Sequence, residues 1–382
     1  MEGARIRIIS DSIISPLGNS TEENFSAVRR GESRLMFHEG ERGVSSPFVA
    51  SLFDDGYISD TFREMCSSEE YTDYEKLSIM SISRALEGTD IDVCSHDTIF
   101  VMSSTKGNIS LLSYEKNVDK ILLGMSAAKI TRFFGNGNAP LTVSNACISG
   151  VSAQIAAARL LMAGRYKNAV IVGCDCQSKF IISGFQSLKA LSIDKCKPFD
   201  ENRNGLNLGE AAAAIICTRD EEPTDSNAWY YGNGVIRNDA NHISGPSRTG
   251  EGSYRALKDV VAGIPLDEIA FINLHGTATL YNDEMESIAL NRAGLASVPV
   301  NGLKGYYGHT LGAAGVLEAI ISMQAVDNNT ILATKGYDTC GTSVALNISN
   351  ENRTTRKRSF VKLLSGFGGC NAALSFTKGG WQ

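Results

Sequence analysis

The chain has 382 residues, 43% apolar and 20% charged, with 36 basic against 42 acidic side chains. A net charge of −6 argues against a nucleic-acid-binding protein, and no apolar run approaches the roughly 18 residues of a membrane-spanning helix. Nine scattered cysteines without a CxxC pair, and a first segment that carries Asp11 and is unlike a secretory signal, predict reduced thiols in a cytoplasmic protein without a metal site.

The first part of the chain alternates between predicted strands and helices. Ser20, with Glu23 three residues later, has the pattern of a capping box at a helix start. Gly164 fits the C-terminal end of a later helix. In chain order, we expect a strand at Ile6–Ile9, helices at Thr21–Arg30 and Tyr74–Leu86, strands at Thr98–Met102 and Leu141–Ser144, a helix from Cys147 or just after it to about Ala163, and strands at Ala169–Gly173 and Ala211–Cys217.

A second alternating set follows a polar linker at Arg219–Asn227. We expect strands and helices at Trp229–Ile236 (strand), Ser253–Ala262 (helix), Ile269–Leu274 (strand), Glu284–Ala293 (helix), just before Asn301 (strand), Leu311–Gln324 (helix), and then strands at Val344–Ile348, Ser359–Leu364 and Ala372–Phe376. The alternation predicts an α/β chain. Two sets of similar content predict a duplicated architecture, with domains at residues 1–218 and 228–382.

One motif, Ser144–Gly150, places Cys147 between a strand and an alanine-rich helix. A thiol at a helix N-terminus feels the positive end of the helix dipole, which favours the thiolate. A sharp turn from strand to helix also holds a nucleophile rigidly. The alternative is that Cys147 is one more buried cysteine.

Two further motifs bring histidines to element boundaries. His275 follows a predicted strand, where it could act as an acid, a base or a hydrogen-bond donor. His309 precedes a helix rich in Gly and Ala, and Lys304 lies five residues before it. A helix N-terminus and a nearby cation both disfavour an imidazolium, so His309 is expected to stay neutral. Taken singly, these residues could be caps or a surface lysine.

A fourth motif, Gly366–Gly369, surrounds Phe367 with glycines. Its exposed N–H groups could form an oxyanion hole, although a plain turn between two strands is the alternative. One cysteine, two histidines and one lysine in such turns together fit covalent thioester chemistry.

The order of these motifs resembles that of the β-ketoacyl-acyl-carrier-protein synthases of the elongating type, the condensing enzymes of fatty-acid and polyketide assembly. The resemblance covers nearly the whole chain. It is carried by Cys147, by the HGTxT…D, KxxxGH…GAAG…E and GFGG motifs, and by Ser15–Asn19, Gly31–Ser33, Lys197–Asp200, Arg203–Gly205 and Gly209–Glu210. It implies a thiolase-like α/β fold in which two duplicated halves form a five-layered αβαβα sandwich.

The resemblance also implies roles for single residues. Cys147 would accept an acyl group, with its own N–H and that of Phe367 as the oxyanion hole and Phe367 as a gate. His275 and His309 would assist the decarboxylation of malonyl-carrier protein and stabilise the enolate. Lys304 would support His309, and the supporting acids would be Glu318, Asp283 and Glu286.

The partners implied are an acyl carrier protein with phosphopantetheine-linked groups and a second copy of the chain, or a different subunit in a heterodimer. The span Lys106–Gly137 is where we expect the contact between subunits, and no cofactor is implied. The chain departs from the family at several positions. These are Ser365 in place of a second aromatic residue, Cys370 in place of Thr, Asn204 in place of an acid, Ala211 in place of Gly, and an acidic Ser67–Lys76 where the family often has a basic docking surface.

Other functions remain compatible with the same scaffold. One is a non-condensing partner subunit that only sets chain length, although such subunits usually lack the cysteine. Another is a malonyl decarboxylase or an acyltransferase. A binding or structural protein is the remaining alternative.

Overall fold

A computed structural model describes residues 3–223 and 225–379. In the first part of the chain the elements are β1 (Arg5–Ile14), α1 (Thr21–Arg29), β2 (Met36–His38), β3 (Phe48–Ser51), α2 (Tyr57–Met65), α3 (Asp73–Leu86), β4 (Thr98–Ser103), α4 (Leu123–Phe133), β5 (Leu141–Val143), α5 (Ser149–Met162), β6 (Asn168–Asp175), α6 (Lys179–Ser187), β7 (Leu208–Gly209) and β8 (Ala211–Asp220).

The second part contains β9 (Trp229–Asn238), α7 (Glu251–Val260), β10 (Ile269–Asn273), α8 (Leu280–Arg292), β11 (Val300–Asn301), α9 (Lys304–Tyr307), α10 (Ala314–Asp327), β12 (Thr330–Ile331), β13 (Arg353–Thr354), β14 (Ser359–Gly366) and β15 (Cys370–Lys378). Short 3₁₀ turns include η2 (Ile109–Ser113), η3 (Val118–Lys120) and η5 (Leu311–Ala313).

The same strand order occurs on both sides of residue 224. The strands run β5-β4-β6-β8-β1 in the first block and β11-β10-β14-β15-β9 in the second. The pair β4–β6 in the first block and the matching pair β10–β14 in the second are parallel. The next pair along the sheet in each block, β6–β8 and β14–β15, is antiparallel. A short antiparallel contact between β1 and β9 joins the blocks into one ten-stranded sheet. The predicted duplication is therefore confirmed in the topology.

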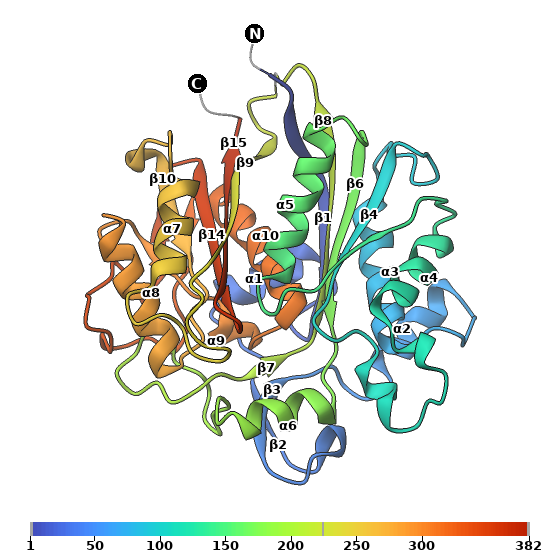
Figure 1. Cartoon of the computed structure of the whole chain (residues 1–382), viewed down its shortest axis with the longest axis horizontal. Coiled ribbons are helices and arrows are strands. Elements are labelled where there is room, and N and C mark those ends of the chain that lie inside the picture. The colour runs from blue at the N-terminus through green and yellow to red at the C-terminus, as the bar shows by residue number, and fades with distance from the viewer. Residues whose placement is uncertain (1–2, 224, 380–382) are drawn as a thin grey trace.

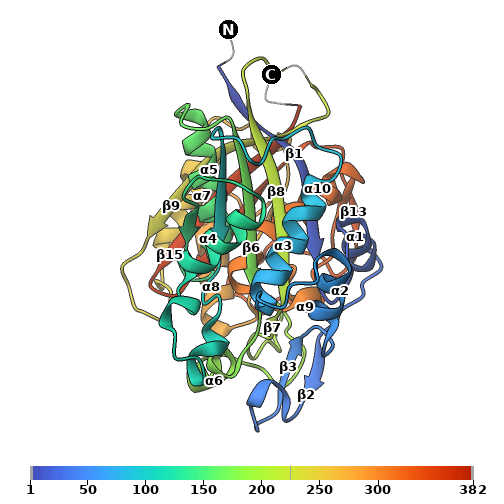
Figure 2. The same cartoon turned by 90° about the vertical axis from the view of Figure 1, so that its right-hand side faces the viewer.

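Helices separate the two blocks and cover their outer faces, which gives the five predicted layers (Figure 1). The helices α5 and α10 lie between the blocks, α3 packs on the outer face of β1, β6 and β8, and α7 packs on β9 and β15. Figure 2 shows α3 and α4 in front of the first block. The thiolase-like α/β fold is thus present. The domain limits of 1–218 and 228–382 stay a prediction, and their outer ends, like residue 224 of the predicted linker, lie outside the described residues.

The two central helices cross at glycines. A Cβ built on Gly150 of α5 would lie 2.9 Å from the Cα of Gly315 in α10, and one built on Gly315 would lie 2.4 Å from the N of Val151. Any larger side chain at either position would push the helices apart, because the backbones themselves are in contact. This close crossing brings the N-terminal ends of α5 and α10 together, and the turns that carry Cys147 and His309 with them.

Two predicted elements need correction. Val344–Ile348 is not a strand, since only Asn347 makes a bridge, to Pro299 at the edge of the sheet. Leu346 and Ile348 alternate because they pack on the core around β10, and not because they form a ladder. The helix predicted at Glu284–Ala293 begins four residues earlier, at Leu280.

The structure also contains elements that the sequence pattern does not predict. The long connection from Asp175 to Glu210 contains α6 and β7, and β2, β3, α2 and α4 were not foreseen. The strands β2, β3 and β7 have only two to four residues each, which is too short for a periodic pattern to show.

Candidate active site

Cys147 lies in a tight turn between β5 and α5, two residues before the helix begins. The preceding residue, Ala146, has φ of +45°, a left-handed conformation that is uncommon for a residue with a Cβ. The Oγ of Ser149 closes the turn, because it accepts from the N–H of Asn145 at 2.8 Å and donates to the carbonyl of Ala146 at 2.6 Å. The turn is therefore held by its own backbone and one hydroxyl.

The thiol is not poised as a free thiolate. Burial raises the pKa of Cys147 to about 12, against the opposing effect of the Lys304 charge. The desolvation of the buried thiol therefore opposes the effect expected from the helix terminus and outweighs that of the nearby positive charges. The thiol must lose its proton in the step in which it reacts.

His275 lies in a turn whose backbone N–H groups donate to two buried carboxylates. Glu286 accepts from the N–H of His275 at 2.7 Å and from that of Gly276 at 2.8 Å. Asp283 accepts from the N–H of Thr277 at 3.0 Å and from that of Phe199 at 2.7 Å. Both acids belong to the first two turns of α8, which is why the earlier start of that helix matters.

The two carboxylates are buried close to each other. Burial raises the pKa of Asp283 to about 6. Burial, together with the nearby Asp283, raises the pKa of Glu286 to about 7. The hydrogen bonds that hold the turn around His275 therefore depend on the protonation of Asp283 and Glu286.

His309 is fixed by backbone hydrogen bonds. Its N–H donates to the carbonyl of Asn207 at 2.7 Å, and its carbonyl accepts from Gly209 at 3.1 Å. The ring Nδ1 accepts from the N–H of Leu311 at 3.2 Å. A neutral ring that accepts at Nδ1 carries its proton on Nε2. Burial, followed by the Lys304 and Lys362 charges, holds the pKa of His309 well below its usual range, so the expected neutral form is confirmed.

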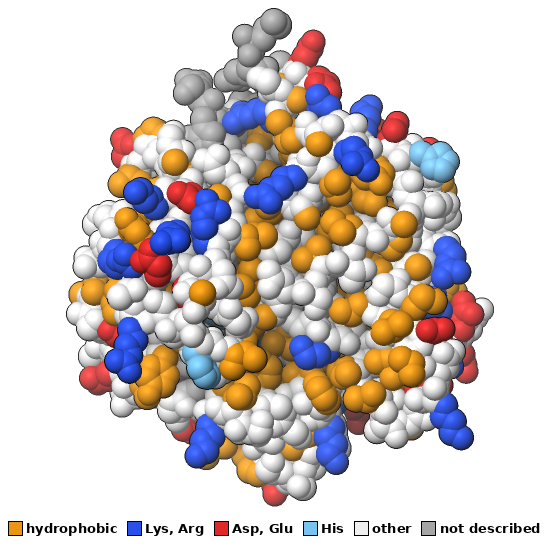
Figure 3. All heavy atoms as spheres, in the orientation of Figure 1, with side chains coloured by type: hydrophobic (Ala, Val, Ile, Leu, Met, Phe, Trp, Pro, Cys, Tyr) orange, Lys and Arg blue, Asp and Glu red, His pale blue; other side chains and the backbone are white. Residues whose placement is uncertain are grey.

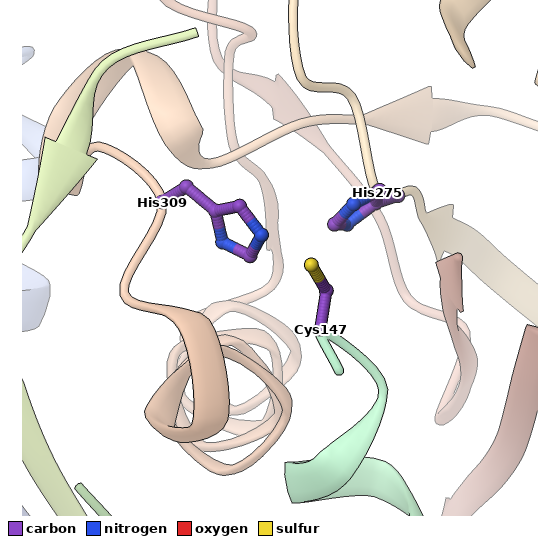
Figure 4. Close-up of side chains that lie close together, drawn as sticks. All are labelled: Cys147, His275 and His309. Atoms are coloured by element: carbon purple, nitrogen blue, oxygen red, sulfur yellow. The ribbon is translucent and has the colours of Figure 1, made fainter. Parts of the chain in front are cut away.

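The three side chains converge. The Cys147 sulfur and one ring nitrogen from each of His275 and His309 all lie within 4.8 Å of one another. The sulfur points between the two rings (Figure 4). The ring centroids are 5.1 Å apart at an interplanar angle of 81°. Nδ1 of His275 and Nε2 of His309 are buried and have no hydrogen-bond partner among residues 3–223 and 225–379. Buried polar atoms are normally paired, so these two are available to a substrate atom.

A cavity of about 390 Å³ opens onto this point. Its walls include all three side chains, and Phe185 and Phe367 stack in them at 5.8 Å between ring centroids. The backbone N–H of Phe367 faces the Cys147 sulfur and lowers its pKa. The predicted oxyanion donor is therefore beside the nucleophile, whereas the roles of oxyanion hole and gate stay predictions.

Lys304 lies at this site in a different way from the one expected. Its Nζ donates to the carbonyl of His275 at 2.6 Å and to Oε1 of Glu318 at 2.8 Å, and its side chain is fully buried. Its direct contact is thus with the His275 turn. Its influence on His309 is electrostatic only.

Lys362 was missed by the sequence analysis. Its Nζ lies 2.6 Å from Oε2 of Glu318, so one carboxylate faces two buried ammonium groups. The signal was present, because Lys362 is the one charged residue in the strand Ser359–Gly366 and has apolar neighbours on both sides. A charged residue is almost never fully buried unless it is paired.

Asp175 was also missed. It is fully buried and accepts from the hydroxyl of Ser104 at 2.6 Å and from the N–H of Gly312 at 2.7 Å. It therefore ties the end of β6 to the turn that follows His309. As the last residue of β6 it belongs to no recognisable motif, and only the fold brings it to this place.

Ser365 and Asn204, two departures from the family, lie in the cavity wall. The Ser365 hydroxyl donates to Oδ1 of Asn371 at 2.8 Å, and Ser253 donates to the same oxygen at 2.6 Å. A hydrogen-bonded polar group thus stands where the family commonly has an aromatic ring. Cys370 lies beside the carbonyl of Phe367 at 3.3 Å.

Comparison with known proteins agrees with this geometry. Two family models match: "Beta-ketoacyl synthase, N-terminal domain" over residues 4–222 and "Beta-ketoacyl synthase, C-terminal domain" over residues 228–338. A curated relative, 3-oxoacyl-acyl-carrier-protein synthase 2 of Vibrio cholerae, is 25% identical over 415 residues, which cover 99% of this chain and 100% of the relative.

Solved structures share the fold. The ketosynthase ApeO of Xenorhabdus doucetiae, in complex with its chain length factor ApeC, matches with a TM-score of 0.85 at 24% identity over 98% of each chain. The ketosynthase of AntDE:AntF, a complex with a type II acyl-carrier protein, matches with a TM-score of 0.82 at 20% identity over 98% of this chain and 100% of the other. The fold and the matched length define a condensing-enzyme scaffold. The chain belongs to the β-ketoacyl synthase family.

Proposed function

We propose that the protein catalyses the decarboxylative Claisen condensation of a malonyl-carrier protein with an acyl group held on Cys147. The product is a β-ketoacyl-carrier protein two carbons longer than the acyl donor. The observation that carries this proposal is the convergence of a buried thiol with two buried neutral imidazoles, each of which has a ring nitrogen without a hydrogen-bond partner among the described residues.

In the first step, the Cys147 sulfur attacks the thioester carbonyl of an acyl-carrier protein. A new C–S bond forms, the old C–S bond breaks, and the thiol proton leaves with the carrier thiol. The negative oxygen of the intermediate would accept from the N–H groups of Cys147 and Phe367. Because the pKa of Cys147 is raised to about 12, proton loss must accompany the attack.

In the second step, a malonyl-carrier protein loses carbon dioxide and becomes an enolate. Its oxygen accepts hydrogen bonds from the two imidazoles, for which the Nε2–H of His309 is oriented by the Leu311 contact. The enolate carbon attacks the acyl carbonyl on Cys147, a C–C bond forms, and the thiolate leaves and takes up a proton. Lys304, Glu318, Asp283 and Glu286 act as positioning residues, since their contacts are with the backbone of the His275 turn or with each other.

For partners, we propose a phosphopantetheine-bearing carrier protein and a second subunit of the same fold. Five large apolar side chains within Lys106–Gly137 are exposed: Leu112, Tyr114, Val118, Leu122 and Met125. Figure 3 shows apolar side chains gathering at the lower right, in the region where Figure 1 draws a loop below α2 and α4. An apolar patch of this kind suits a subunit contact, whether with a second copy or with a different chain.

The acidic segment Ser67–Lys76 has a partly structural cause. Thr72 and Glu75 form a capping box at the start of α3, and Glu75 also pairs with Lys129 at 2.9 Å. Its acidity therefore says less about carrier docking than the sequence alone indicated. No helix of the described residues is long and apolar enough to cross a membrane. The cytoplasmic location and the absence of a metal or cofactor stay predictions.

The proposal is tested by intact-mass measurement. The protein is mixed with a panel of acyl-carrier proteins of different chain length, and malonyl-carrier protein is then added. We expect a mass gain on Cys147 that disappears on malonyl addition, together with a β-keto product two carbons longer. Acylation by no donor would favour the chain-length-setting subunit, and loss of carbon dioxide without condensation would favour a decarboxylase. The Cys147→Ala variant controls for acylation elsewhere.

A further inference from the structure

The buried charges beneath the two imidazoles include one lysine that the proposed mechanism does not use. Lys362 lies in β14 with no exposed side-chain surface. Besides its ion pair with Glu318, its Nζ donates to the carbonyl of Leu363 at 3.0 Å and to that of Leu274 at 3.2 Å. The carbonyl of Leu274 is the one immediately before His275.

The two lysines therefore act on consecutive peptide groups. Lys362 holds the carbonyl of Leu274, and Lys304 holds that of His275 at 2.6 Å. On the other side of the same turn, Glu286 accepts from the N–H groups of His275 and Gly276. The two ammonium groups bind carbonyl oxygens of the turn, and the carboxylate binds its N–H groups. Each charge therefore contacts backbone atoms of opposite partial charge.

The group around Glu318 carries a net positive charge. Lys304 and Lys362 contribute two positive charges and Glu318 one negative charge, and all three side chains are buried. A single Lys–Glu pair would be neutral. The second lysine thus adds a cation whose charge acts on both rings, and of the two acids that hold the turn Glu286 also interacts with it.

We infer that Lys362 is a positioning residue whose charge keeps His275 and His309 neutral, so that both rings can donate to the enolate oxygen. The inference rests on the proposed function. The reason lies in ring chemistry: a protonated His309 would present an Nδ1–H to the Leu311 N–H, and two donors cannot face each other.

The direction of the electrostatic effect supports the inference. Lys362 is among the charges that lower the pKa of both His275 and His309, after burial and Lys304. Its own pKa is lowered by burial to about 8, so it carries its charge at neutral pH. Removing that charge raises the pKa of both rings, and a larger fraction becomes imidazolium as the pH falls.

The test is a titration of ring nitrogens by NMR on ¹⁵N-histidine-labelled protein, because the chain has only five histidines. The test variant is Lys362→Gln, which keeps a donor and loses the charge. We expect both buried rings to titrate at a pH higher by on the order of one unit than in the wild type. The acidic limb of malonyl decarboxylation should move upward by the same amount.

Two further variants complete the design. Lys357→Met is the matched control, because Lys357 donates to the carbonyl of Ile269 at 3.1 Å, at the far end of the same strand β10, and should leave the ring titration unchanged. The double variant Lys362→Gln with Glu318→Gln restores the net positive charge and should return both rings toward wild-type behaviour. Should Lys362→Gln not fold, Lys362→Met takes its place.

Unchanged ring titration in Lys362→Gln would overturn the inference. So would a rise that persists in the double variant, since it would show that the charge is not the cause. A wild-type protein that neither acylates nor decarboxylates would refute the proposed function alone, because the ring titration does not depend on turnover.

Discussion

The two halves of the molecule repeat one strand order and support the site by different means. The first half contributes Cys147, held in a turn by backbone conformation and the hydroxyl of Ser149. The second half contributes both histidines and the buried charges beneath them, including Lys304, Lys362 and Glu318. In the first half, the strands β4 and β6 carry one buried charge, Asp175 at the end of β6, and it accepts from the N–H of Gly312 in the turn that follows His309.

This difference teaches how a duplicated fold divides a two-step reaction. A nucleophile needs an exact direction of approach, which a rigid turn supplies. Rings that stabilise a developing charge need a fixed protonation state, which buried charges supply. The repeated framework brings the ends of α5 and α10 together, and the second half also places the N–H of Phe367 beside the nucleophile of the first.

The largest effect is expected from a substitution in the second half alone. His309→Ala should lower condensation by about 10²- to 10³-fold, because one donor to the enolate oxygen is lost. Acylation of Cys147 should stay measurable by intact mass. Equal loss of both steps would contradict the separation of roles.

A second substitution tests the backbone conformation of the turn that holds Cys147 in the first half. Ala146→Val places a β-branched residue at φ of +45°, which should cost at least about 1–2 kcal/mol of strain and reduce acylation strongly. Ala146→Gly is the control, and it should keep acylation and leave or raise thermal stability. If the valine variant acylates as fast as the wild type, the backbone conformation is not what holds the nucleophile.

Phe367→Ala tests a contact between the two halves. Loss of the ring that stacks on Phe185 should slow acyl transfer by about 10-fold, since a positioning contact in the cavity wall disappears. Malonyl decarboxylation should change less. Stopped-flow rates of the two steps decide this, and an unchanged acylation rate would argue against a gate.

The smallest effect concerns stability and pH. The folded-state pKa of Glu286 is raised to about 7, so its contribution to stability is complete at acidic pH and is lost as the pH rises through that value. The melting temperature of the wild type should fall as the pH rises from about 4.5, the ordinary pKa of a glutamate, to about 7. Glu286→Gln should flatten this profile by about 2–4 °C. Parallel profiles in calorimetry would show that Glu286 does not titrate there.

Much of this site was predictable, because its chemistry is concentrated in short motifs at element boundaries. Cys147, His275 and His309 each follow or precede a recognisable strand or helix, and their convergence follows from the fold. Lys304 was placed correctly in the site but with the wrong contact, since no spacing reveals that its Nζ reaches the His275 carbonyl.

What the sequence could not supply was burial. The raised pKa of Cys147 depends on desolvation, and the pairing of Lys362 with Glu318 joins residues from β14 and α10 that no local pattern links. The missing elements, such as α6, have the same origin, because their apolar residues pack on parts of the chain far away in sequence.

The most direct test of the central claim compares Cys147→Ala with His309→Ala in two assays, acyl transfer and malonyl decarboxylation. The division between halves predicts that Cys147→Ala loses acyl transfer and keeps decarboxylation, whereas His309→Ala keeps acyl transfer and loses decarboxylation. Loss of both activities in each variant, with folded protein, would contradict it.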